Sequence, residues 1–82
     1  MPEICCFLGI VISMYFDDHN PPHFHVRYNE YRAVFAIRNG NLLDGYIPAK
    51  VRGLVEEWAE QHLDELLSMW ESKEFHKVKP LV

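Results

Sequence analysis

The sequence has little cysteine, no excess of positive charge and no long apolar run. Its two cysteines, Cys5 and Cys6, are adjacent, so a bridge between them would be strained and no disulfide framework is expected. We expect both to be reduced thiols, buried or partly exposed. The net charge of −4 argues against broad electrostatic binding of DNA or RNA, which needs a positive field.

No apolar run reaches the length of a membrane span, so no membrane contact is expected. The first residues lack the basic flank and the long apolar core of a signal peptide. Both features predict a cytoplasmic protein. The sequence also contains no repeat, linker or low-complexity tract.

The chain of 82 residues is expected to form a single domain over residues 1–82. A chain of this size buries roughly 60% of its unfolded surface, so its stability is marginal. With 49% hydrophobic and 13% aromatic residues it can still build a core. A small core of this kind often depends on a protein partner or on formation of a homo-oligomer.

Four segments carry strand signals. Residues 7–16 are almost continuously apolar, which predicts one strand covered on both faces. Residues 23–28 alternate between polar and apolar types, and residues 31–38 return after a turn at Asn29-Glu30. Asn39-Gly40 is a strong hairpin signal, and a short strand is expected over 41–46 with a bend or bulge at Gly45.

The second half of the chain is predicted to be helical. Pro48 is suited to a first helical turn, and apolar residues recur at helical spacing as far as Lys73. One straight helix of that length, about 39 Å, would overhang a sheet of short strands. We therefore expect a break near residues 61–64, followed by an irregular tail over 75–82.

These elements predict an α+β fold. An antiparallel sheet of three or four strands comes first, and a C-terminal helix or broken helix pair packs on one face of it. The residues expected to make that contact are apolar and lie on one helical stripe: Leu54, Trp58, Leu66 and Trp70.

Three histidines, His19, His23 and His25, lie within seven residues that also contain the pair Pro21-Pro22. Histidine is a frequent general acid or base and the commonest metal ligand. Each proline ring fixes its own φ angle, so the two prolines stiffen the chain just before the alternating segment 23–28. His23 and His25 are two residues apart, so on a strand they project from the same face, together with Arg27.

One interpretation of this face is acid–base cleavage of RNA without a metal. His23 and His25 would serve as acid and base, and Asp18 would orient one of them. Arg27, or Arg32 from the neighbouring strand, would hold the phosphate. Tyrosine rings would stack on bases, and the candidates are Tyr15, Tyr28 and Tyr31.

Two other interpretations stay open. No resident cofactor is required, but His19, His23 and His25 are candidate ligands of a divalent metal. Asp17 or Asp18 could replace His19 as the third ligand. The other interpretation is a non-enzymatic module in which the histidines decorate a solvated face or an interface with a protein partner.

A longer set of residues resembles a small bacterial family, Domain of Unknown Function 4160. The specific part is the string His-Asn-Pro-Pro-His-Phe-His over residues 19–25. The resemblance covers essentially the whole chain and includes Gly9-Ile10-Val11-Ile12, Tyr28, Tyr31, Asp44-Gly45, Pro48, Trp58, His62, Trp70 and Lys79-Pro80-Leu81. The chain departs from the family pattern at Ser13, where arginine is expected, and at Tyr46, where lysine is expected.

The resemblance implies a place in a two-gene module. Members are often encoded beside Domain of Unknown Function 2442 proteins, an arrangement similar to a type II toxin–antitoxin pair. It implies that this chain is the toxin-like component, with an antitoxin-like protein as partner and RNA as a candidate target. It assigns no catalytic residues.

Overall fold

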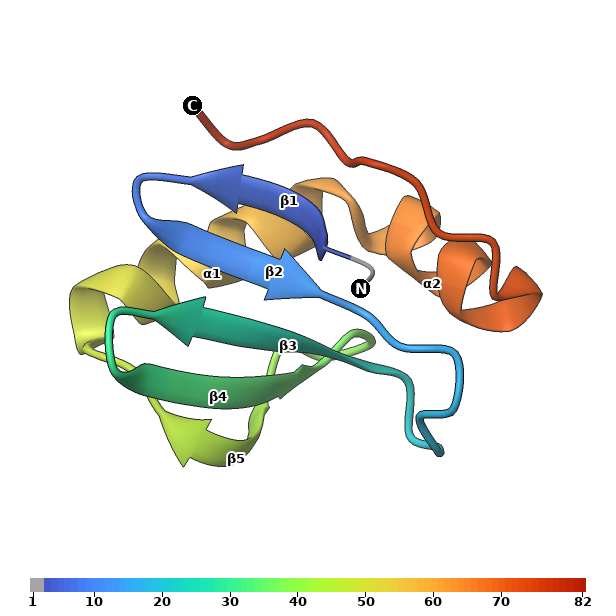
Figure 1. The fold of residues 1–82 in the computed structure, drawn as a ribbon, viewed down its shortest axis with the longest axis horizontal. Coiled ribbons are helices and arrows are strands. Elements are labelled where there is room, and N and C mark those ends of the chain that lie inside the picture. Colours follow the sequence, from blue (N-terminus) through green and yellow to red (C-terminus); the bar gives the residue numbers. More distant parts are fainter. Residues whose placement is uncertain (1–2) are drawn as a thin grey trace.

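A five-stranded antiparallel sheet forms the first half of the fold in the computed structural model, which describes residues 3–82. Its strands are adjacent in chain order: β1 (Glu3–Phe7), β2 (Ile10–Ser13), β3 (His23–Tyr28), β4 (Tyr31–Ala36) and β5 (Leu42–Tyr46). Two helices follow, α1 (Ala49–Gln61) and α2 (Leu63–Ser72). The predicted α+β class is confirmed, and the sheet has five strands rather than three or four (Figure 1).

The extra strand arises from the apolar segment 7–16, which was wrongly predicted to be one strand. The chain reverses at Leu8 and Gly9, whose φ angles are 51° and 79°. Phe7 therefore pairs with Ile10 in an antiparallel register. Apolar residues on both sides of this tight turn enter the same core, namely Phe7, Ile10, Ile12 and Met14. The predicted cover on both faces is not found, because Val11 and Ser13 line a hollow on the open face.

The two hairpins predicted from turn residues are present. Asn29 has a φ of 54° between β3 and β4, as the Asn-Glu turn predicted. Gly40 has a φ of 72° in the next turn, and its N–H donates to the Ala36 carbonyl. β4 ends at Ala36 instead of Arg38, because the turn begins there.

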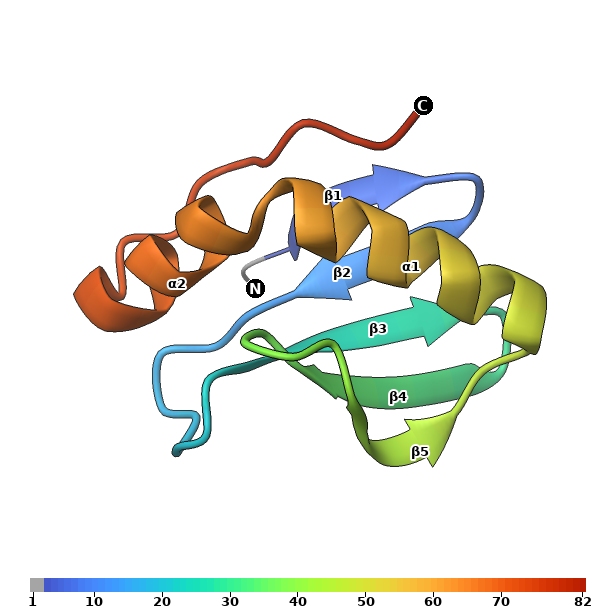
Figure 2. The same cartoon turned by 180° about the vertical axis from the view of Figure 1, so that it is seen from behind.

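The helical half is broken at His62, inside the predicted window. Pro48 immediately precedes α1, as expected. α1 lies across one face of the sheet, and α2 continues past its end, beside the β2–β3 loop (Figures 1 and 2). Of the residues predicted to pack, Trp58, Leu66 and Trp70 are buried and Leu54 is half-buried against the core.

The tail over 75–82 has no helix or strand, as predicted, but it is bound to the sheet and to α1. The Val78 N–H donates to the Ile4 carbonyl over 2.7 Å at the edge of β1. The Trp58 indole N–H donates to the Lys79 carbonyl over 2.9 Å. The tail therefore covers the β1 edge of the sheet (Figure 2).

Neither of the two helices within residues 3–82 combines the length and the apolar character needed to cross a membrane.

The two cysteines differ in exposure, and neither is in a disulfide. Cys5 is buried, and burial raises the pKa of its thiol, whereas Cys6 is exposed.

Because the thiolate is the reactive form, iodoacetamide should modify Cys5 at least about tenfold more slowly than Cys6. Mass spectrometry should find one adduct on the folded protein and two in denaturant. Cys6→Ser should leave the folded protein unmodified, and rapid double labelling of the folded chain would contradict this assignment.

Candidate active site

The β2–β3 loop places the carboxylate of Asp18 between two histidines of β3. The Asp18 Oδ2 atom lies 2.9 Å from His25 Nε2 and 3.2 Å from His23 Nε2. One ligand atom from each of the three residues lies within 4.8 Å of the others. The structure thus brings together the three residues predicted to be catalytic.

His23 is held at both ring nitrogens. Its Nδ1 lies 2.7 Å from the Pro21 carbonyl oxygen, which can only accept, so Nδ1 carries the hydrogen. The Nε2 of a neutral ring then presents a lone pair to the Asp18 carboxylate. The ring also contacts that of Trp70, with centroids 5.1 Å apart. The His23 side chain is therefore fixed, with its Nε2 directed at the Asp18 carboxylate.

His25 is the more accessible of the two, with 34% of its side chain exposed against 13% for His23. Its Nε2 faces Asp18, and the edge of its ring meets Tyr15 with centroids 4.8 Å apart. When Nε2–H donates to Asp18, the other nitrogen of the neutral ring carries the lone pair. That Nδ1 has no hydrogen-bond partner within residues 3–82.

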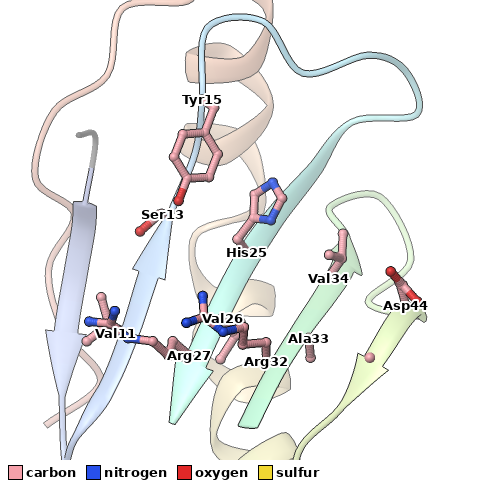
Figure 3. Close-up of a pocket in the computed structure, with 11 residues that line it drawn as sticks. Val11, Ser13, Tyr15, His25, Val26, Arg27, Arg32, Ala33, Val34 and Asp44 are labelled. Atoms are coloured by element: carbon pink, nitrogen blue, oxygen red, sulfur yellow. The ribbon is translucent and has the colours of Figure 1, made fainter. Parts of the chain in front are cut away.

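The sheet face opposite the helices carries two arginines beside His25 (Figure 3). Arg27 and Arg32 are directly opposed in the β3–β4 register, and both are exposed. Like charges in that position destabilise a sheet, yet neither arginine forms an ion pair with any residue of the described chain, 3–82. With His25, Tyr15 and others they line a hollow of about 390 Å³. One acidic residue, Asp44, lines the same hollow, so two guanidinium groups stand against one carboxylate, a balance that favours an anion.

Other predicted residues lie elsewhere. Tyr28 and Tyr31 pack against the core, so neither offers its ring to the hollow. His19 is exposed and lines a separate depression with Trp70 and Lys73. The structure brings Asp18 rather than His19 to the histidine pair.

Three groups of the site were not predicted. Trp70 was predicted only as core, and its helical spacing gave no indication of its contact with His23. The Pro21 carbonyl is a backbone group, and its role depends on the loop conformation. Ser13 is buried, pairs in register with His25 and lines the hollow. In the sequence it stands out as a polar residue within an apolar run and as a departure from the family pattern, and neither feature indicated a place in the site.

The comparison with known protein families identifies the family of this chain. The family model described as "Domain of unknown function (DUF4160)" matches residues 9–71. The chain belongs to this family. The matched segment of this DUF4160 protein includes Asp18, both site histidines and both arginines. No curated protein and no solved structure gave a significant match.

The charges of this DUF4160 protein are unevenly distributed. The exposed residues Glu56, Glu57 and Glu60 belong to α1, on the covered side of the sheet. Arg27 and Arg32 are on the open side. A net charge of −4 therefore coexists with a face that can attract phosphate.

Proposed function

We propose that this DUF4160 protein binds single-stranded RNA on the open sheet face and cleaves it by proton transfer at His25. The observation that carries the proposal is the Asp18–His25 pair next to two arginines without carboxylate partners among residues 3–82. This reaction needs a general base, a carboxylate that fixes the tautomer of that base, and cations that bind the phosphate.

The proposed step is attack by the 2′-hydroxyl on the adjacent phosphorus. His25 Nδ1 takes the hydroxyl proton, a bond forms between the 2′-oxygen and phosphorus, and the bond to the 5′-oxygen breaks. The leaving 5′-oxygen takes a proton from water, because both nitrogens of His23 are engaged, and the hydroxide that remains takes the proton back from His25 Nδ1. Asp18 holds the His25 ring and stabilises the imidazolium, as a carboxylate does in a catalytic triad.

The remaining groups bind the substrate. Arg27 and Arg32 can each donate two hydrogen bonds to phosphate oxygens, and they offset the charge that develops during attack. Tyr15 lines the same hollow and provides an aromatic ring for a base. Because the nucleophile is the 2′-hydroxyl, DNA is not a substrate.

A cellular role as the toxin-like component of a two-gene module is part of the proposal, supported by the family resemblance. Its antitoxin-like protein partner would present acidic groups to Arg27 and Arg32 and compete with RNA for this face.

Purified protein should cleave a single-stranded RNA and leave a 2′,3′-cyclic phosphate. His25→Ala should lower the rate at least about 100-fold, the usual range for loss of a general base. His76→Ala is the matched control, since His76 is an exposed histidine on the tail and lies outside the cluster. In cells, the wild-type protein should slow growth, and His25→Ala should not.

Three results would overturn the proposal. Equal cleavage by wild type and His25→Ala would remove His25 from the reaction. RNA binding or tight partner binding without any cleavage would instead identify a non-enzymatic module. Substrate with 2′-deoxy sugars should stay intact, and its cleavage would exclude the step described above.

A further inference from the structure

Asp18, His23 and His25 converge on one point from two segments of the chain, the β2–β3 loop and β3. From this convergence we infer that the three residues form a binding site for a divalent transition-metal ion of the zinc class. The inference goes beyond the proposed RNA cleavage, which uses no metal, and it stands or fails separately.

The donor set and its spacing carry the inference. Two imidazole nitrogens with one carboxylate oxygen is a ligand set that zinc uses in open sites. With bonds of about 2.0–2.1 Å, tetrahedral donors lie roughly 3.3 Å apart. Asp18 Oδ2 is already 3.2 Å from His23 Nε2 and 2.9 Å from His25 Nε2. All three donor atoms lie within 4.8 Å of one another, so rotation of the histidine side chains can bring them to the spacing that an ion needs.

The surroundings of His23 favour a metal ligand. Its Nδ1–H is held by the Pro21 carbonyl, which leaves the Nε2 lone pair directed toward Asp18. A backbone carbonyl is one of the common partners for the far nitrogen of a metal-binding histidine, because it fixes the tautomer and the ring orientation. The contact with Trp70 restrains the same ring. The Nε2 lone pair and the negatively charged carboxylate repel each other, and a cation bound between them would remove this repulsion.

The site has an open side. Within residues 3–82 only three side chains reach the point of convergence, and all three are half-buried rather than enclosed. A fourth position is thus left for water or another small ligand, unlike the closed four-ligand sites that stabilise folds. A bound ion would occupy the His25 Nε2 and move its proton to Nδ1, so zinc should inhibit the cleavage proposed above.

The test is a zinc titration of protein that carries no histidine tag, by calorimetry and by competition with a chromogenic chelator. We expect one ion per chain. Asp18→Asn, His23→Gln and His25→Gln should each weaken binding at least about tenfold. His19→Gln is the matched control, because His19 is exposed, adjacent to Asp18 and outside the cluster. Its affinity should equal that of wild type.

Cobalt provides a second readout that does not depend on stability. Co²⁺ at this site should give the intense visible absorption of a four-coordinate ion, and Asp18→Asn should change that spectrum even if it folds normally. Non-saturable zinc binding, or an equal loss in His19→Gln and His25→Gln, would overturn the inference. No RNA is present in these titrations, and cleavage measured with a chelator present tests the proposed function alone.

Discussion

Replacing Trp58 with alanine is expected to lower the free energy of unfolding by about 3–5 kcal/mol, enough to leave much of the chain unfolded. The Trp58 side chain is fully buried on α1. Its ring contacts those of Phe7 on β1 and Phe24 on β3, with centroids 6.4 and 5.8 Å away. The substitution therefore opens a cavity between the sheet and α1 in a domain with little stability to lose.

A second consequence of the Trp58→Ala substitution concerns the tail. The indole N–H donates to the Lys79 carbonyl, so alanine also removes the link between α1 and residues 75–82. Trp58→Phe keeps one ring in the core but removes the N–H and part of the indole volume, so it should cost more than the hydrogen bond alone, about 1 kcal/mol, and less than Trp58→Ala. Urea denaturation followed by circular dichroism measures both variants.

Leu43→Ala is the control, at an exposed position on β5, and it should change the free energy of unfolding by less than about 0.5 kcal/mol. Equal losses in Trp58→Ala and Leu43→Ala would contradict the role of Trp58.

The elements that could be predicted are those whose turns carry their own backbone preference. Asn29 and Gly40 adopt positive φ, which asparagine and glycine tolerate, and both hairpins lie where these residues indicate. In the first turn Gly9 also has a positive φ, but a single glycine inside an apolar run did not reveal a reversal of the chain. Leu8 also has a positive φ, which leucine rarely adopts, and the residues on either side of it are all apolar. Only the pairing of β1 with β2 reveals the reversal.

Part of the site could also be predicted, because strand alternation and a local turn fix the positions of some of its residues. Alternation along β3 places His25 and Arg27 on one face, and a two-residue turn fixes Arg32 opposite Arg27. The position of Asp18 follows no local rule, because residues 14–22 are irregular and are held by contacts with α2 and with β3. Whether Asp18 or His19 reaches the histidines is therefore decided by tertiary packing.

A bend or bulge at Gly45 was predicted from a glycine within a strand, and the structure shows why no other residue fits. Gly45 has a φ of 81° and pairs with Ala33, and the register shift of the β4–β5 ladder lies two residues away, at Leu43, between the pairs Val34–Asp44 and Phe35–Leu42. A Cβ added there would lie 2.1 Å from the Arg32 carbonyl oxygen and 2.9 Å from the Ala33 Cα. Both neighbours are backbone atoms of a central strand, so neither can move without breaking the ladder.

Gly45→Ala is therefore expected to cost at least about 3 kcal/mol, the sum of left-handed backbone strain and a clash with backbone. Gly40→Ala is the matched control, since Gly40 has a φ of 72° but no atom within 4 Å of the added Cβ. It should cost only the strain, about 1–2 kcal/mol. Hydrogen exchange should show β5 amides losing protection first in Gly45→Ala, because the clash lies in that strand pair. Equal losses of unfolding free energy in the two variants would show that the close approach of β4 to Gly45 does not add to the cost of the substitution. A larger loss in Gly45→Ala, with weaker RNA binding, would connect the strand pair to the hollow, which Asp44 and Gly45 line together with Arg32.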